Sequence, residues 1–343
     1  MVSFAKFSGS GDTSPSSLFE TTSDVELVHA MAPDAKILLV LTEGNGTLDG
    51  FSYVISHNAA DIATMSWWQQ LTNRTKVELY ESEYAKSADE DITLVTISMD
   101  WGSNNTVPFP RCPNQPFCTN QTGFWTEDLP TSYLMPEYSP YVTVVGGTEL
   151  RMQSGVYGTE VGWNRSGGGP SNIFSEPNWQ IGPGVPMNGH RNIPDIALDA
   201  SCSTPYYAYW KGRVGGFCGT SGAAPTFAGI IADIMQAAGG RLGFLNPTLY
   251  SLALSDPSVY HDVTSGCSLV QIGSHTATGY CSSLNWDFVT GWGSIDATKL
   301  ASRLVRDKFA LEGWIGGLTV TGIVVLAIVF ARRKRRRRLQ SAF

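Results

Sequence analysis

The stretch Gly219-Thr220-Ser221-Gly222-Ala223-Ala224-Pro225 places a serine among small residues, directly before an apolar segment at residues 227–231. We expect a helix from residue 221 to residue 239. A serine at a helix start meets unpaired backbone N–H groups and the positive end of the helix dipole. Such N–H groups can stabilise an oxyanion, so Ser221 is a candidate nucleophile. A serine in this position can also act only as a helix N-cap.

Short apolar strands alternate with helices on the amino-terminal side of this serine. The strands are not amphipathic, which is typical of strands buried on both faces. This alternation predicts an α/β fold with a parallel sheet flanked by helices. We interpret residues 103–136 as a long loop insertion and residues 206–217 as a hairpin. Strands are expected at residues 35–41, 61–66, 92–98 and 141–145, and helices at residues 16–31 and 76–88.

Two acidic residues, Glu20 and Asp24, are spaced one helical turn apart on the first expected helix. Residues at this spacing lie on the same face of a helix. A serine nucleophile needs a base within hydrogen-bond reach, and a carboxylate can serve when a neighbour tunes its pKa. The usual alternative for such a pair is a solvated helix face. None of the five histidines is followed by glycine; they are His29, His57, His190, His261 and His275.

These motifs together resemble a known peptidase family. The serine stretch resembles the Ser-Gly-Thr-Ser-x-x-x-Pro signature shared by subtilisins and sedolisins, with Cys218 in place of the first serine. The His-Gly element of the subtilisin triad is absent. Residues 23–37 are similar to the helix that carries the catalytic Glu and Asp of sedolisins. The resemblance covers residues 9–300 and implies a subtilisin-like fold. Within the family, the order of these segments is most similar to the lysosomal tripeptidyl-peptidase group.

The resemblance implies a role for each residue of the site. Ser221 would be the nucleophile, Glu20 the general base and Asp24 the group that orients Glu20. Residues 97–102 match the family's oxyanion turn, Ser-Gly-Asp-Ser-Gly, at Asp100. A carboxylic acid donates to an oxyanion only when protonated, which implies activity at acidic pH. Met99 and Trp101 depart from the small residues of the family turn.

The same resemblance implies a substrate cleft. Ser66 and Trp67 fall where the family has an edge that pairs with the substrate backbone, and Trp68 replaces its glycine. Gly167, Gly168 and Gly169 correspond to the family's glycine-rich cleft segment, and the implied substrates are peptides or proteins.

A calcium site is also implied by the resemblance. Two segments near the carboxyl terminus are similar to those that bind one Ca²⁺ in sedolisins. Carboxylates with main-chain carbonyl groups suit calcium, although the aspartates can also simply cap turns. The family has glycine where this chain has Ser283 and Asn285. The implied ligands are Asp262, Val263, Ser283, Asn285 and Asp287.

The carboxyl terminus predicts a membrane anchor. Residues 314–331 form an uncharged, mostly apolar run, and seven basic residues follow at 332–338. This pattern predicts a transmembrane helix with a cytoplasmic basic flank. We therefore expect a single-pass membrane protein with a lumenal or extracellular body, located in lysosomes or endosomes or at the cell surface. The expected domains are an incomplete peptidase domain at 1–303, a linker at 304–313, the span at 314–331 and a tail at 332–343.

Cysteines and glycosylation motifs agree with a non-cytosolic body. The six cysteines allow 15 pairings, and short loops favour Cys112–Cys118, Cys202–Cys218 and Cys267–Cys281. No signal peptide is visible at the amino terminus, so we expect an amino-terminally truncated chain. Without the basic run, 16 Lys and Arg face 30 Asp and Glu, which argues against binding nucleic acid. Sequons occur at Asn45, Asn73, Asn104, Asn120 and Asn164.

The sequence thus favours a serine-type acid peptidase, acting either as a tripeptidyl-peptidase or as an endopeptidase. The alternatives are a catalytically dead, membrane-anchored binding protein and a partial gene product. Trp68, Trp101 and the expected truncation motivate these alternatives. The sequence leaves the cleavage preference and the oligomeric state open.

Overall fold

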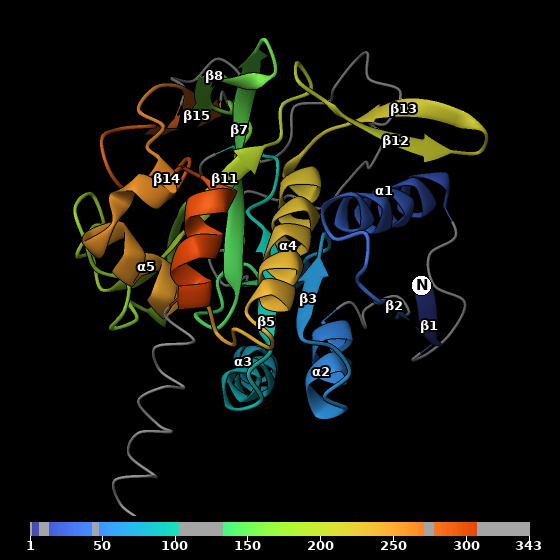
Figure 1. Cartoon of the computed structure of the whole chain (residues 1–343). Helices are drawn as coiled ribbons and strands as arrows, with labels where there is room; N and C mark the ends of the chain where they lie inside the picture. Colours follow the sequence, from blue (N-terminus) through green and yellow to red (C-terminus); the bar gives the residue numbers. More distant parts are fainter. Residues whose placement is uncertain (1, 7–13, 43–47, 103–132, 271–277, 307–343) are drawn as a thin grey trace, which may run out of the picture.

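A parallel sheet forms the centre of the molecule in the computed structural model, which describes residues 2–6, 14–42, 48–102, 133–270 and 278–306 (Figure 1). Four parallel strands lie in the order β11-β7-β5-β3, and β8 pairs antiparallel with β7. Such a sheet of buried, β-branched strands is the architecture expected from the sequence. The strands are β3 (Ile62–Met65), β5 (Thr93–Ile97), β7 (Thr143–Gln153), β8 (Val156–Gly162) and β11 (Ile196–Asp199).

Helix α4 crosses one face of this sheet and contacts all four parallel strands, while α1 packs beside it (Figure 1). Helices α2 and α3 pack against each other around a second apolar cluster. The α1–α4 pairing matters for the site because α1 carries both candidate carboxylates. The helices are α1 (Pro15–Met31), α2 (Asp49–Ser56), α3 (Arg74–Asp89), α4 (Thr220–Ala237) and α5 (Asn246–Ser255).

Local sequence explains where these helices begin. Ser14 caps α1, because its side chain accepts a hydrogen bond from the Ser17 N–H at 3.3 Å, and Pro15 supplies a preset φ at the first turn. Asn73 caps α3 by accepting from the Lys76 N–H at 3.3 Å. Helix α4 differs, because its N-cap residue Gly219 makes no side-chain capping bond. The first N–H group of α4, that of Thr220, instead donates to the Asp100 carboxyl at 2.7 Å.

Short strand pairs surround the central sheet. Strand β1 runs parallel to β2, and the other five pairs are antiparallel. The pair β12–β13 is the expected hairpin and leans on α1. The pairs are β1 (Val2–Lys6) with β2 (Ile37–Leu41), β4 (Gln69–Leu71) with β6 (Tyr133–Met135), β9 (Gly169–Ser175) with β10 (His190–Ile193), β12 (Tyr206–Trp210) with β13 (Arg213–Phe217), β14 (Tyr260–His261) with β17 (Ser294–Ile295), and β15 (Cys267–Val270) with β16 (Thr278–Cys281).

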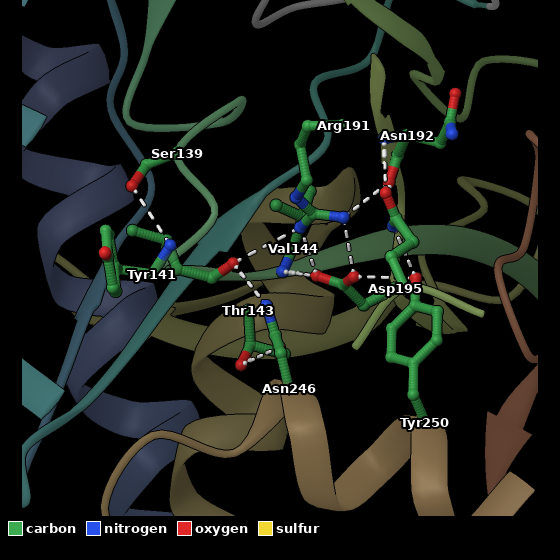
Figure 2. A network of polar contacts seen from close by, with 11 residues as sticks. Ser139, Tyr141, Thr143, Val144, Arg191, Asn192, Asp195, Asn246 and Tyr250 are labelled. Atoms are coloured by element: carbon green, nitrogen blue, oxygen red, sulfur yellow. Dashed lines mark hydrogen bonds and ion pairs between the residues drawn. The ribbon is translucent and has the colours of Figure 1, made fainter. Parts of the chain in front are cut away.

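A buried ion pair lies at the start of strand β11. Arg191 and Asp195 are both fully buried, and two guanidinium nitrogens donate to the two carboxylate oxygens at 2.8 and 2.7 Å (Figure 2). Asp195 also accepts from the Tyr250 hydroxyl at 3.0 Å and from the Val144 N–H at 2.9 Å. The network therefore ties β10 and α5 to the central strand β7.

Most of the expected elements are confirmed, and the differences are informative. The sequence did not predict α2, whose eight residues are too few for a clear helical period. The end of the expected loop insertion forms strand β6, since it finds a partner in β4. Residues 103–132 lie outside the described residues.

Two of the three favoured disulfides are confirmed, Cys202–Cys218 and Cys267–Cys281. The third, Cys112–Cys118, lies outside the described residues, as do the sequons at Asn45, Asn104 and Asn120. Asn73 and Asn164 are exposed, so both remaining sequons lie at the surface.

The prediction of a single-pass membrane protein is contradicted. A membrane-spanning helix needs about 20 mostly apolar residues. Within the described ranges, no helix combines the length and the apolar character needed to cross a bilayer. The segment on which the prediction rested, residues 314–331, lies outside the described residues.

Candidate active site

The candidate nucleophile lies in the first turn of α4. Ser221 is only 9% exposed and is preceded by Gly219, whose φ of +117° suits glycine. A Cβ atom at Gly219 would lie 2.5 Å from Oδ2 of Asp100, so the Asp100 carboxyl needs a glycine there. The Cys202–Cys218 disulfide fixes the chain directly before this turn. The turn with Ser221 and the turn with Asp100 are therefore in contact.

Glu20 reaches Ser221 from helix α1. Its carboxylate lies close enough to the Ser221 side chain for that hydroxyl to affect its pKa, and its Oε1 atom is buried without a hydrogen-bond partner among the described residues. Burial raises the pKa of Glu20 to about 7, the Ser221 hydrogen bond lowers it, and the nearby Asp100 carboxyl raises it further. A carboxylate beside a serine hydroxyl with this raised pKa is suited to accept the proton of that hydroxyl.

Asp24 lies one turn further along α1. Its Oδ1 accepts a hydrogen bond from the Ser66 hydroxyl at 3.1 Å. Burial and the neighbouring Glu20 carboxylate raise the pKa of Asp24 well above its usual range, and the Ser66 bond opposes this rise. The same Ser66 hydroxyl lies 3.5 Å from the carbonyl oxygen of Ser221. Ser66 therefore links Asp24 to the nucleophile turn.

Asp100 lies just beyond the carboxyl end of β5, next to the end of β3, where Ser66 lies. Its Oδ1 accepts from the Thr220 N–H at 2.7 Å and from the Thr220 hydroxyl at 2.8 Å. Burial raises the pKa of Asp100, which favours its neutral form, while the Thr220 bonds and the Arg165 charge oppose the rise. Arg165 also donates to the Asp100 carbonyl oxygen at 3.0 Å.

Sequence reasoning did not assign roles to Thr220 and Arg165. Thr220 directly precedes the candidate nucleophile, and this position could have indicated that it belongs to the site. Arg165 precedes the glycine-rich segment 167–169, but only the folded chain brings it to the Asp100 turn.

The two departures from the family's oxyanion turn are visible in the structure. Met99 is buried and has a φ of +78°, a left-handed conformation that costs a non-glycine residue about 1–2 kcal/mol. Trp101 packs edge to face against Trp68, with ring centroids 4.7 Å apart. The two tryptophans therefore join the Asp100 turn to the Ser66 segment.

The residues expected in the substrate cleft have different surroundings. Ser66 is buried beside Asp24, and Trp67 packs with the second apolar cluster. A Cβ atom at Gly167 would collide with the Ser98 backbone, and one at Gly168 with the Phe288 backbone. Gly169 has more space, with the Tyr280 ring 3.7 Å from such an atom. Gly167 and Gly168 thus allow close backbone packing behind the Asp100 turn.

The five expected calcium ligands lie on two segments that touch. The Asp262 carboxylate accepts from the Asn285 N–H at 2.9 Å, and Asp287 accepts from the Ser283 N–H at 3.0 Å. Asn285 has a φ of +67°, a torsion that asparagine tolerates and that fits the glycine of the family. Val263 is buried beside Asp262. Two carboxylates and main-chain carbonyls on converging loops fit calcium chemistry.

These aspartates also satisfy hydrogen bonds within the protein. Oδ1 of Asp287 accepts from the N–H groups of Val289 and Thr290 at 2.7 and 2.9 Å. Within the described ranges, no group of three or more His, Cys, Asp or Glu residues is arranged to hold a metal ion. A cation at this site would therefore depend on main-chain oxygens as much as on carboxylates.

The fold thus brings Ser221, Glu20, Asp24 and Asp100 into one site. The candidate base comes from α1, the candidate nucleophile from α4 and the third carboxyl from the end of β5. A hydroxyl, a carboxylate beside it and a second acid beside a helix start can perform acyl transfer. Among the described residues, none of the interactions that shift the pKa of Glu20 or Asp24 comes from a cation.

Comparisons with known proteins agree with this geometry. Residues 10–293 match the model of the "Subtilase family". The chain is 30% identical to kumamolisin of Bacillus sp. (strain MN-32), over 83% of this chain and 50% of that protein. It is 32% identical to sedolisin of Pseudomonas sp. (strain 101), over 77% of this chain and 44% of that protein. The chain therefore spans half or less of the length of these curated relatives.

A solved structure gives the corresponding comparison of folds. Pseudomonas sedolisin, described as a serine-carboxyl proteinase complexed with two molecules of pseudo-iodotyrostatin, superposes with a TM-score of 0.73 at 28% identity. The match covers 90% of this chain and 85% of that chain.

Proposed function

This chain belongs to the subtilase family, and from that premise we propose that it is a serine-type acid peptidase that forms an acyl-enzyme on Ser221. The observation that carries the proposal is the position of the buried Glu20 carboxylate beside the Ser221 side chain, on a helix that packs against α4. The sedolisin-type relatives support the same class of reaction. The substrates would be peptides or proteins.

In the proposed first step, the Ser221 oxygen attacks the carbonyl carbon of the scissile peptide bond, and Glu20 takes the hydroxyl proton. Asp24 shares this role, because its own raised pKa lets the pair hold one proton between them. Glu20 then gives the proton to the leaving amine, and water hydrolyses the ester by the same route. Ser66 keeps Asp24 in place through the bond at 3.1 Å.

The negative charge of the tetrahedral intermediate would be stabilised by two kinds of donor. The first is the backbone N–H of Ser221 in the first turn of α4, since the Thr220 N–H before it is taken by Asp100. The second is the protonated Asp100 carboxyl, whose Oδ1 is held by Thr220. Because Asp100 donates only as a neutral acid, loss of its proton at higher pH would lower the rate.

The alanine variant Ser221→Ala tests this proposal most directly. Without the nucleophilic oxygen, peptide hydrolysis at acidic pH should fall by more than about 10⁴-fold. The matched control is Ser251→Ala, an exposed position on α5, which should keep full activity. Turnover of Ser221→Ala close to that of the parent protein would show that another group is the nucleophile.

A fluorophosphonate probe separates the peptidase from the catalytically dead alternative. The Trp68–Trp101 contact beside the Asp100 turn is the feature that favours this alternative, since it narrows the space there. The expected result is covalent labelling of Ser221, found by mass spectrometry of the peptide that contains residue 221. A folded protein in which the probe does not label Ser221 would support the hypothesis of a catalytically dead binding protein.

We also propose that Asp262 and Asp287, with the main-chain oxygens of Val263, Ser283 and Asn285, bind one Ca²⁺. The ion would stiffen the two loops and take no part in the chemistry. A chelator should then lower the melting temperature by roughly 5–10 °C, the size expected at about 100-fold saturation. Asp262→Asn should remove that dependence, and an unchanged melting temperature with chelator would exclude the site.

A further inference from the structure

A second group of buried carboxyls lies away from the catalytic residues, between α3 and the segment that follows β6. Glu137 is fully buried, and neither of its carboxyl oxygens has a hydrogen-bond partner from another described residue. Glu81, on α3, is half-buried and has one buried oxygen in the same condition, and the Ser139 side chain lies near its carboxyl. The catalytic mechanism uses neither of these acids.

The charge balance of this group decides its protonation. Its nearest cation is Arg191, which is already paired through two hydrogen bonds with Asp195 (Figure 2). If Glu81 and Glu137 were both ionised, three carboxylates would share one guanidinium in the interior. Burial of unpaired charges is strongly unfavourable, so the neutral forms of the two glutamic acids fit the fold best.

The other groups near this pair are mostly acids and phenols. Tyr84 and Tyr80 approach from α3, and the Tyr84 hydroxyl donates to the Leu48 carbonyl at 3.4 Å. The Tyr80 hydroxyl donates to Asp49 of α2 at 2.8 Å, so α2 adds a further acid to the region. A second cation, Lys76, lies over the Tyr80 ring at 5.7 Å from its centroid, and it is not among the groups that shift the pKa of Glu81 or Glu137.

We propose that Glu81 and Glu137 form a pH-sensitive structural switch, in which both carboxyls are protonated in the folded protein and their ionisation toward neutral pH loosens α3 and residues 136–142 from the sheet. This switch is distinct from the proposed catalytic chemistry. A protein with an inactive Ser221 would still show it.

Burial supports the direction of this switch. It raises the pKa of Glu81 to about 7, although the Ser139 bond and the Arg191 charge oppose the rise. Burial also raises the pKa of Glu137 well above its usual range. When the pKa of an acid is higher in the folded than in the unfolded chain, the protein becomes less stable as the pH rises above the pKa of the unfolded chain. The fold should therefore be most stable below about pH 4.3, the value of a free glutamate, and weaken up to about pH 7.

The test is thermal unfolding of the full chain between pH 4.5 and 7.5, with Ser221→Ala as the parent to prevent self-digestion. We expect the melting temperature of this parent to fall by roughly 5–15 °C over this range. In the Glu81→Gln/Glu137→Gln variant, the fall should be at least halved, because two titrating groups are removed. Glu78→Gln, an exposed position on the same helix, is the matched control and should follow the parent.

Glu20→Gln in the same parent separates the catalytic carboxyls from the switch, since its effect should add to that of the double variant. An unchanged pH dependence in the double variant would overturn the proposal. If that variant fails to fold, Glu81→Gln alone and infrared spectroscopy of the parent decide. A protonated-carboxyl C=O band at pH 6 that weakens in Glu81→Gln supports the switch, and a band unaffected by this change excludes it.

Discussion

Two groups of buried acids in this protein have different partners. Asp195 lies directly before β11 beside a guanidinium and accepts bonds from Arg191, Tyr250 and Val144 (Figure 2). Glu20 and Asp24 lie on α1 beside the hydroxyls of Ser221 and Ser66, and no cation contributes to their pKa shifts.

The difference shows what a cation does to a buried carboxylate. Beside Arg191, the charge of Asp195 is neutralised by a partner that no pH change within the working range removes. Without a cation, burial raises the pKa of Glu20 to about 7 and that of Asp24 well above its usual range. The first arrangement holds the fold together, and the second keeps protons available for chemistry.

Removing the cation from the first region should have the largest effect. Arg191→Met leaves Asp195 as an uncompensated buried charge, which should reduce the free energy of unfolding by about 3–5 kcal/mol. Urea denaturation at pH 6 measures this loss. The Arg191→Met/Asp195→Leu variant should recover part of it, because both charges are then gone. A cost below about 1 kcal/mol for the single variant would mean that the pair does not hold the fold.

Removing an acid from the second region should act on rate and leave the fold intact. Glu20→Gln should lower the rate of peptide hydrolysis by about 10²–10⁴-fold, because the proposed general base is lost. Its melting temperature at pH 7.5 should rise slightly, since a carboxyl with a raised folded pKa destabilises the protein above its unfolded pKa. At pH 4.5 the two proteins should melt alike. A large loss of stability in Glu20→Gln would show that Glu20 stabilises the fold, as Asp195 does.

Asp100, the third carboxyl of the site, is tested by the pH dependence of the proposed reaction. The proposed rate falls on the alkaline side as Asp100 loses its proton, and on the acid side as the Glu20–Asp24 pair gains a second one. Asp100→Asn keeps an acceptor for Thr220 and supplies a donor that does not titrate. Its maximum rate should fall about 10-fold while the alkaline limb disappears from the profile of kcat/KM against pH. Asp89→Asn, at an exposed position, is the control, and an unchanged limb in Asp100→Asn would exclude this role.

An exposed pair provides the smallest expected effect. Arg74 and Glu78 lie one turn apart on α3, with 67% and 60% of their side chains exposed and 3.0 Å between Nε and Oε1. Glu78→Ala should change the free energy of unfolding by less than about 0.5 kcal/mol, because water screens the pair. Urea denaturation at low and high salt measures it. If Glu78→Ala reduced the free energy of unfolding as much as Arg191→Met, burial would not explain why the two ion pairs differ in their contribution to stability.

Much of the fold and part of the site were predictable from local patterns. Helix α1 follows from Ser14, Pro15 and the apolar spacing behind them, and the spacing of Glu20 and Asp24 follows from the helix. The short loops between Cys202 and Cys218 and between Cys267 and Cys281 favoured the observed pairs. Helix α2 was missed because eight residues carry too little periodicity.

Other parts of the site depended on contacts between distant segments. Thr220 bonds Asp100 across 120 positions of the chain, and Ser66 bonds Asp24 across 42. The family resemblance implied a substrate cleft for Ser66, Gly167 and Gly168, and this stays a prediction; the structure adds that Ser66 lies beside Asp24 and that the two glycines pack against the backbone of other segments. Packing at such separations is not encoded in local spacing.

The sequence by itself determined the order of strands and helices, the serine at the start of α4 and the two acids on one face of α1. Those features depend on periodicity and local hydrogen bonds, which act within a few residues. The tertiary structure decided which buried acids receive a cation and which do not, because Arg191 pairs with Asp195, while the described residues leave both carboxyl oxygens of Glu137 without a hydrogen-bond partner. That choice is made by packing, since the interior raises the pKa of every acid that it encloses without a partner.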